Sequence, residues 1–223
     1  MIFFDIDGTL LDHDKAEKNG AIDFLRNYKN EIECSENEFV ERWFTLSNKY
    51  FEKFLAKEMS FQEQRRMRIK DLFGHHLSDK QADTKFNNYL ELYKSNWSAF
   101  EDVIPCLEKL KQQGYHLGII SNGDYNQQVE KLERIRIQHF FDCIITSSEI
   151  GVAKPNPIIF QEACVQANVS FYESYYIGDR LEVDAIGSTD AGLVGVWINR
   201  KNNTTHKGVK VIHSLDELTL LVI

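Results

Sequence analysis

Residues 2–10 read IFFDIDGTL, a short apolar run that ends at two acidic residues, Asp5 and Asp7. Three consecutive large apolar residues followed by a charge are typical of a short buried strand. The run is far too short to span a membrane, and no basic segment precedes it as in a signal peptide. We therefore predict a strand at Ile2–Phe4, with Asp5 and Asp7 directly after its carboxyl end.

A long region with few helix breakers follows this strand. All three prolines come after residue 100, and between residues 14 and 100 the only glycines are Gly20 and Gly74. Apolar residues recur in this region at helical spacing, which predicts that residues 14–95 are mostly helical. One such series consists of Phe39, Trp43, Leu46, Tyr50 and Phe54.

The rest of the chain alternates short apolar segments with helical patterns. This alternation indicates right-handed crossovers and an α/β fold built on a doubly wound parallel sheet. Because the helical region comes directly after the first strand, we predict a helical cap domain at residues 14–95. It is inserted into a core domain of residues 1–13 and 96–223. The predicted strands are Ile2–Phe4, His116–Ile120, Cys143–Thr146, Ser174–Ile177 and Gly195–Ile198. The predicted core helices are Val103–Gln113, Tyr125–Ile135, Pro157–Ala167 and Glu182–Ala191.

Polar residues follow the predicted strands at their carboxyl ends, which is where doubly wound sheets bind their ligands. The set contains three carboxylates, a serine, an asparagine and, in the loop after the third strand, a lysine. Taken alone, residues of these types are more often helix caps or turn formers, so the prediction depends on their occurrence together. They are Asp5, Asp7, Asp179, Ser121, Asn122 and Lys154.

This combination of side chains suits the transfer of a phosphoryl group. Carboxylates that converge on one point repel each other unless a cation lies between them. Oxygen ligands favour Mg²⁺, which keeps open positions for water and a substrate phosphate. A lysine and a serine supply the positive charge and the hydrogen-bond donor that a phosphoryl group in transfer requires. A carboxylate can itself act as the nucleophile and form an aspartyl-phosphate.

Four segments in the same order resemble the motifs of the haloacid dehalogenase superfamily. Asp5–Leu10, which reads DIDGTL, resembles the first motif, and Ile119–Gly123, which reads IISNG, resembles the second. Lys154-Pro155 is similar to the third motif. Gly178–Asp184, which reads GDRLEVD, is similar to the fourth. The resemblance covers essentially the whole chain, and it implies the fold predicted above.

The resemblance implies a magnesium site and two catalytic aspartates. Asp5 is expected to be the nucleophile and a magnesium ligand. Asp7 is expected to be the general acid and base, and to bind the metal through its backbone carbonyl. Asp179 completes the expected metal site, and Asp184 is expected to support that site from behind while it pairs with Lys154.

The same resemblance implies a phosphate-binding set and a cap. Ser121 is expected to donate a hydrogen bond to a phosphoryl oxygen, together with the backbone N–H of Asn122. Lys154 is expected to offset the charge of Asp5 and of the phosphate. The helical insert at 14–95 is similar to the small cap domain of subclass I of this superfamily.

Within the superfamily, Asp7 disfavours dehalogenation, because dehalogenases lack the second aspartate of the first motif. The pattern is most similar to bacterial pyrimidine 5′-nucleotidases and phosphoglycolate-type phosphatases, and the stretch Gly195–Arg200 fits that group. We therefore expect a Mg²⁺-dependent phosphatase for a small phosphorylated metabolite, such as a nucleoside 5′-monophosphate. The alternatives are a phosphosugar mutase of the same superfamily and a non-catalytic protein that binds phosphorylated metabolites.

Composition limits the partners of the chain. A formal charge of −8 over 223 residues argues against binding to a nucleic-acid polymer, which needs a basic face. No apolar stretch approaches the length of a membrane span, and four scattered cysteines fit a reducing cytoplasm. We expect a cytoplasmic monomer or homodimer with no membrane partner. We interpret the basic cluster Arg65–Arg68 as a solvated helix face.

Overall fold

The computed structural model describes residues 1–202 and 204–221 of the chain. Contacts between residues divide it into two compact units. The α/β unit comprises Met1–His13 and Trp97–Ile223, and the helical unit comprises Asp14–Asn96. No helix among the described residues is long and apolar enough to cross a membrane.

The α/β unit is built on one parallel sheet, as the sequence predicts. Within the described residues the sheet has six strands in the order β3-β2-β1-β4-β5-β6, and every neighbouring pair is parallel. The prediction missed only the edge strand β6, because three residues beginning with a lysine give too little apolar pattern to recognise. The strands are β1 (Ile2–Phe4), β2 (Leu117–Ser121), β3 (Cys143–Thr146), β4 (Tyr175–Gly178), β5 (Val194–Ile198) and β6 (Lys210–Ile212).

The strand order reverses beside β1. The chain passes from β1 to β2 and β3 on one side, then returns to place β4, β5 and β6 on the other side. Phe4 is in register with Ile119 of β2 and with Ile177 of β4, so the carboxyl ends of these three strands are adjacent. Ligands of doubly wound sheets bind at such a reversal point. The residues that follow β1, β2 and β4 are therefore the ones that meet there.

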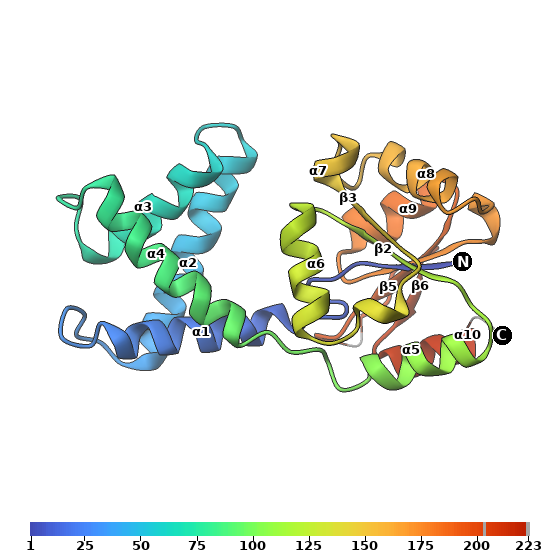
Figure 1. Cartoon of the computed structure of the whole chain (residues 1–223), viewed down its shortest axis with the longest axis horizontal. Helices are drawn as coiled ribbons and strands as arrows, with labels where there is room; N and C mark the ends of the chain where they lie inside the picture. The colour runs from blue at the N-terminus through green and yellow to red at the C-terminus, as the bar shows by residue number, and fades with distance from the viewer. Residues whose placement is uncertain (203, 222–223) are drawn as a thin grey trace. The chain divides into compact units, whose positions relative to one another are not determined.

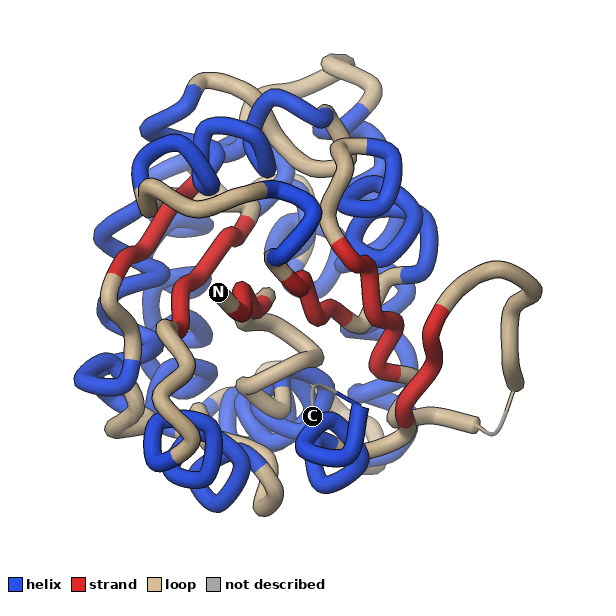
Figure 2. The backbone as a smooth tube through the Cα atoms, turned by 90° about the vertical axis from the view of Figure 1, so that its right-hand side faces the viewer, coloured by secondary structure: helices blue, strands red, loops and turns tan. Residues whose placement is uncertain are grey.

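Helices cover both faces of this sheet (Figures 1 and 2). Helices α8 and α9 lie over one face, and α5 and α10 lie together over the other (Figure 1). The predicted helix Glu182–Ala191 is instead a π-helical turn, η3, followed by α9. The Gly187 N–H reaches back five residues to the Glu182 carbonyl, a widened turn that apolar spacing does not reveal. The helical segments are α5 (Val103–Gln112), α6 (Tyr125–Arg134), η1 (Gln138–Phe140), α7 (Ser147–Ile150), α8 (Pro157–Gln166), η2 (Phe171–Glu173), η3 (Leu181–Ile186), α9 (Gly187–Asp190) and α10 (Leu215–Leu221).

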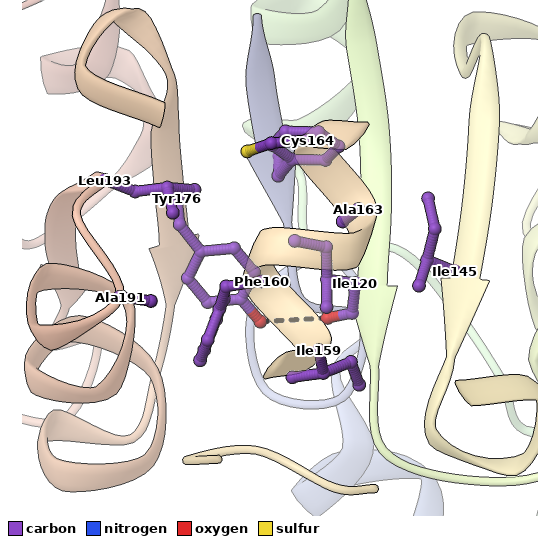
Figure 3. Packing of buried hydrophobic residues seen from close by; sticks show 10 residues of the cluster. Ile120, Ile145, Ile159, Phe160, Ala163, Cys164, Tyr176, Ala191 and Leu193 are labelled. Atoms are coloured by element: carbon purple, nitrogen blue, oxygen red, sulfur yellow. Dashed lines mark hydrogen bonds between the residues drawn. The ribbon is translucent and has the colours of Figure 1, made fainter. Parts of the chain in front are cut away.

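A compact apolar cluster joins α8 to the sheet (Figure 3). Phe160 of α8 packs edge-on against Tyr176 of β4, with ring centroids 5.1 Å apart. Tyr176 is fully buried, and its hydroxyl donates a hydrogen bond to the Ile120 carbonyl of β2 at 2.9 Å. A tyrosine in an apolar core requires such a partner, because an unpaired buried hydroxyl is costly. The cluster also contains Phe3, Ile145, Ile159, Ala163, Cys164, Ala191 and Leu193.

The helical unit contains the long helices that the periodicity predicts. Three of them begin at a capping box, in which a serine and a Glu or Gln three residues later satisfy each other's backbone N–H groups. The N-cap residues of α2, α3 and α4 are Ser35, Ser60 and Ser78, and each helix begins at the next residue. The helices are α1 (His13–Asn27), α2 (Glu36–Leu55), α3 (Phe61–Phe73) and α4 (Asp79–Ser95).

The interior of the helical unit is mostly aromatic. Trp43 is fully buried, with its ring centroid 4.0 Å from Tyr89 and 5.7 Å from Phe24. The interpretation of Arg65–Arg68 as a solvated face is wrong for Arg68, which is only 8% exposed. Its long apolar stem allows it to enter the interior, and its guanidinium group lies over the Phe86 ring.

Replacement of Trp43 by alanine should destabilise the protein strongly, because it leaves a large cavity among these rings. We expect the free energy of unfolding to fall by about 3–5 kcal/mol, measured by urea unfolding with far-UV circular dichroism. Phe51→Ala is a matched control on the same helix, since Phe51 is 41% exposed. A loss for Trp43→Ala no larger than that for Phe51→Ala would contradict this account of the interior.

Candidate active site

A buried lysine joins two of the predicted carboxylates. The Lys154 ammonium group donates hydrogen bonds to Asp5 Oδ1 and to Asp184 Oδ1, each at 2.7 Å. All three side chains are buried, with only 3% of the Lys154 side chain exposed. The Lys154 backbone is held in turn by Asn122, whose side-chain amide exchanges hydrogen bonds with the Lys154 N–H and C=O. The loop that carries the lysine is thereby fixed to the end of β2.

Tyr176 is a further partner of Lys154 that sequence reasoning missed. Its hydroxyl accepts a hydrogen bond from the Lys154 ammonium group at 2.5 Å and lies 3.1 Å from Asp184 Oδ1. Burial and the nearby negative charges of Asp184 and Asp5 raise the pKa of Tyr176 well above its usual value. The hydroxyl therefore stays neutral and bridges the ammonium group to the Ile120 carbonyl. In the sequence, Tyr176 is simply one more large residue of a buried strand.

Asp179 lies beside this cluster and keeps one oxygen free. Its backbone carbonyl accepts a hydrogen bond from the Trp197 indole N–H at 2.8 Å, which fixes the main chain after β4. Its Oδ1 atom is buried and has no hydrogen-bond partner among the described residues. Single oxygens of Asp5, Asp179 and Asp184 all lie within 4.8 Å of one another. A buried carboxylate oxygen without a protein partner is a place where a bound ion or water is expected.

Two motif glycines are required by the close approach of these aspartates. Gly8 has a φ of +82°, and a Cβ atom there would lie 2.5 Å from Asp179 Oδ2. A Cβ atom at Gly178 would lie 2.4 Å from the Asp184 side chain. Any larger residue at either position would displace a carboxylate of the site. The glycines of the first and fourth motifs are thus explained by packing against the acidic residues.

Ser121 is oriented by a glutamine on α6. The Gln128 side-chain amide donates hydrogen bonds to Ser121 Oγ at 2.7 Å and to the Asn122 carbonyl at 3.0 Å. A carbonyl oxygen can only accept, so the amide nitrogen must be the group that faces both atoms. The Ser121 hydroxyl therefore accepts from Gln128, and its own proton is available to donate to another group.

Asp7 is held by a lysine on α6, the helix that also carries Gln128. The Lys131 ammonium group donates to Asp7 Oδ2 at 2.6 Å, and His13 Nδ1 lies 3.9 Å from Asp7 Oδ1. Burial opposes the charge on Asp7, but Lys131 and then His13 outweigh it and hold the pKa of Asp7 below its usual value. Gln128 and Lys131 are three residues apart and share one face of α6 with the buried Leu132. Polar residues at the buried positions of this helix were the sequence signal that we overlooked.

Crowding of negative charge changes the ionisation of the two central aspartates. Burial, together with the charges of Asp184 and Asp7, raises the pKa of Asp5 to about 6, although Lys154 opposes the shift. Burial and the charges of Asp5 and Asp184 raise the pKa of Asp179 to about 7. One ammonium group therefore does not compensate all the carboxylates at this point. The charge that remains favours an additional cation.

The donor set fits Mg²⁺. Carboxylate oxygens of Asp5 and Asp179 converge, the Asp179 Oδ1 atom has no partner among the described residues, and the local charge is in excess. Oxygen ligands, few in number and from short carboxylates, are those that Mg²⁺ prefers. Both Asp184 oxygens are already bound, one by Lys154 and the other by the Arg180 N–H at 3.0 Å. Asp184 is therefore better placed to support the site than to bind a metal.

All seven residues predicted for the site lie in the α/β unit, at or beyond the carboxyl ends of its strands. Lys154 connects Asp5, Asp184 and, through the main chain, Asn122. Asp7 and Ser121 belong to a second group that is organised from α6. The residues that the prediction missed are Tyr176, Trp197, Gln128 and Lys131.

Comparison with known families places the chain among proteins with this architecture. The family model of haloacid dehalogenase-like hydrolases matches residues 2–198. The chain is 34% identical over 209 residues to glyceraldehyde 3-phosphate phosphatase from Methanopyrus kandleri, a match that covers 89% of this chain and 83% of the relative. It is 37% identical over 110 residues to pyrimidine 5′-nucleotidase YjjG from Escherichia coli, covering 48% and 49% of the two chains.

A solved structure agrees with the fold. The HAD-hydrolase YfnB from Bacillus subtilis, a structure bound to magnesium, superposes with a TM-score of 0.81. The match covers 99% of this chain and 97% of that protein, at 22% sequence identity. At this identity the likeness establishes the shared fold, α/β with a parallel sheet, and no more.

Mg²⁺ should stabilise the protein more at neutral than at acidic pH. Because the pKa values of Asp5 and Asp179 are raised from 3.8, the metal-free folded state binds more protons than the unfolded state between roughly pH 4 and pH 7. Its unfolding free energy therefore falls as the pH rises through that range, and a bound cation offsets the loss. We expect the gain in melting temperature on adding Mg²⁺ to be larger at about pH 7.5 than at about pH 5. Asp179→Asn should remove most of this gain, whereas an equal gain at both pH values would contradict the assignment.

Removal of the Tyr176 hydroxyl should impair turnover without unfolding the protein. A hydrogen bond to a charged group contributes about 1.5–3 kcal/mol, so we expect Tyr176→Phe to lower kcat roughly tenfold or more. Loss of a group that positions Lys154 should change kcat more than KM. Tyr175→Phe, on the adjacent residue of the same strand, is the control and should retain full activity. Equal kinetics for the two variants would exclude a role for the hydroxyl.

Proposed function

Because the chain belongs to the haloacid dehalogenase-like hydrolases, we propose that it is a magnesium-dependent phosphatase for a small phosphorylated metabolite. The observation that supports this proposal is the buried ion-pair cluster of Asp5, Lys154 and Asp184, with Asp7 two residues beyond Asp5. A nucleophilic carboxylate, a fixed positive charge and a second carboxylate for proton transfer are what hydrolysis of a phosphate ester requires.

Asp5 is the proposed nucleophile. One of its carboxylate oxygens attacks phosphorus, the bond from phosphorus to the leaving oxygen breaks, and an aspartyl-phosphate forms on Asp5. Lys154 holds Asp5 Oδ1 at 2.7 Å and offsets the charge that collects on the phosphoryl oxygens. Ser121 donates its free proton to one of those oxygens, since Gln128 occupies its acceptor side. Mg²⁺, held by Asp5, the Asp7 carbonyl and Asp179, would supply positive charge for the phosphoryl oxygens.

Asp7 is the proposed acid and base. In the first half of the reaction it gives a proton to the leaving oxygen, so that the product departs as a neutral alcohol. In the second half it accepts a proton from the water that attacks phosphorus. The bond between Asp5 and phosphorus then breaks, inorganic phosphate is released and the Asp5 carboxylate is restored. The proton that Asp7 gained serves the next turnover.

We propose that the helical unit, residues 14–96, is the cap domain and selects among phosphate esters, because the catalytic groups all belong to the α/β unit. The named substrates of the two relatives are a triose phosphate and pyrimidine nucleotides. Both are small phosphate esters of alcohols, and the proposed substrate belongs to this class. A nucleoside 5′-monophosphate is our first candidate.

The nucleophile is tested by replacing Asp5 with asparagine, which is nearly isosteric but is a poor nucleophile. Hydrolysis of p-nitrophenyl phosphate should fall by at least about a hundredfold, a barrier increase of about 2.7 kcal/mol. Wild-type activity should require Mg²⁺ and disappear on addition of EDTA. Asp190→Asn, at an exposed aspartate of the same unit, is the control and should remain active. Turnover by Asp5→Asn near the control rate would refute the proposed mechanism.

The substrate is best sought in a release assay for inorganic phosphate across nucleotides, sugar phosphates and small phosphorylated acids. The mutase alternative is tested by following a hexose 1-phosphate by NMR, which distinguishes isomerisation from release of phosphate. A protein that binds phosphate esters but hydrolyses none, including p-nitrophenyl phosphate, would instead be a binding protein.

A further inference from the structure

Helix α6 presents a buried cation to Asp7. The Lys131 ammonium group is 2.6 Å from Asp7 Oδ2, and the Lys131 side chain is only 6% exposed. Removal of a lysine from water is costly unless it is paired, and a buried pair contributes little net stability. An apolar residue at this buried position would avoid that cost. Lys131 therefore requires an explanation beyond packing.

The two oxygens of Asp7 are in different environments. Oδ2 accepts the hydrogen bond from Lys131, whereas Oδ1 is buried and accepts no hydrogen bond from any described residue. His13 Nδ1 is 3.9 Å from Oδ1, beyond hydrogen-bond distance. The Gln128 amide donates to Ser121 and to the Asn122 carbonyl, and it also lies close enough to Asp7 to help lower the pKa of that carboxyl. Lys131 therefore holds the Asp7 carboxylate through one of its two oxygens.

We propose that Lys131 is a positioning residue that anchors the Asp7 carboxylate through Oδ2 and so fixes its orientation for proton transfer. This inference rests on the proposed function and extends it to a residue outside the four sequence motifs. Lys131 itself touches neither the phosphorus nor the leaving oxygen. It acts through Asp7 by fixing the direction in which the carboxylate points.

The consequence differs between leaving groups. An alkyl alcohol departs only when Asp7 delivers a proton to its oxygen, so formation of the aspartyl-phosphate depends on the position of Asp7. A p-nitrophenolate anion is stable and departs without a proton. The attack of water depends on Asp7 with either substrate, because Asp7 must accept a proton from the water. Loss of Lys131 should therefore slow both steps with an alkyl ester, and only the second step with p-nitrophenyl phosphate.

Two other roles for Lys131 predict different kinetics. If Lys131 only stabilised the fold, its loss would reduce kcat/KM for both substrates alike through a smaller active fraction. If it bound the phosphoryl group directly, its loss would lower kcat/KM for both esters, because both carry that group. The value of kcat/KM reports the first half of the reaction, in which the leaving group departs. Loss of Lys131 changes kcat/KM differently for the two esters only if Lys131 assists the donation of a proton to the leaving oxygen.

The experiment compares wild type and Lys131→Met on p-nitrophenyl phosphate and on the best alkyl phosphate from the screen described above. For Lys131→Met we expect kcat/KM to fall roughly 30-fold or more with the alkyl ester and less than about threefold with p-nitrophenyl phosphate. With p-nitrophenyl phosphate, kcat should fall and a burst of nitrophenolate should precede steady turnover. Melting temperature monitors folding. If the methionine variant does not fold, Lys131→Gln is judged by the same comparison.

Two further variants serve as controls. Arg134→Met removes an exposed cation of the same helix, paired with Glu130 at 2.8 Å, and should change neither ester. In a double-mutant cycle, Lys131→Met should have little further effect on the alkyl ester once Asp7 is replaced by asparagine, because the two residues act as a unit. An undiminished effect in the Asp7→Asn background would show that Lys131 does not act through Asp7.

The outcomes separate this inference from the function on which it rests. A wild-type protein that hydrolyses neither ester overturns the proposed function and the role of Lys131 with it. A wild-type protein that hydrolyses both, with equal losses or no loss in the Lys131 variant, overturns the role of Lys131 alone. A loss confined to the alkyl ester in kcat/KM, absent from the Asp7→Asn background, supports the proposed role.

Discussion

The Lys154 ammonium group is buried between two carboxylates, and the rest of the active site depends on this contact. Without it, Asp5 and Asp184 would be adjacent buried anions. Removal of one partner from a buried ion pair costs about 3–5 kcal/mol. Lys154 also determines which oxygens remain available, because it binds Oδ1 of both aspartates. The surrounding groups, Tyr176 and the Asn122 amide, fix the lysine in turn.

The sheet supplies the constraint that brings these groups together. Strand order reverses beside β1, so the ends of β1 and β4 are adjacent and deliver Asp5 and Asp179 to one point. Close approach then requires Gly8 and Gly178, at which a Cβ atom would overlap a carboxylate of the site. The same closeness raises the pKa values of Asp5 and Asp179. Repulsion between like charges is thus built into the site, and a bound cation would relieve it.

Helix α6 provides a second set of interactions that the strands do not. Its buried face carries Gln128, which orients the Ser121 hydroxyl, and Lys131, which anchors Asp7. The proposed nucleophile and the proposed phosphate-binding charge are therefore organised around Lys154, whereas the proposed proton-transfer group is organised from α6. The groups proposed for nucleophilic attack and for proton transfer are thus held by different buried lysines, Lys154 and Lys131.

Local pattern in the sequence was sufficient for the class of fold and for the candidate residues. Apolar runs followed by acidic or polar residues identified five of the six described strands, together with Asp5, Asp7, Ser121 and Asp179 at their ends. Those signals are local, because a strand and the residue after it are adjacent in the chain. The family match over residues 2–198 agrees with the predicted family and fold class.

Only the tertiary structure decided which side chains support the candidates. Tyr176 and Lys154 are separated by 22 residues, and Lys131 and Asp7 by 124, so no spacing rule connects them. Tyr176 reads in the sequence as a core residue, and Lys131 as an ordinary helix lysine. Their roles come from the burial of a polar atom beside a charge, and burial is a property of the folded chain. The sequence could therefore indicate the chemistry of the site, while the packing of strands and α6 determined how its charges are paired.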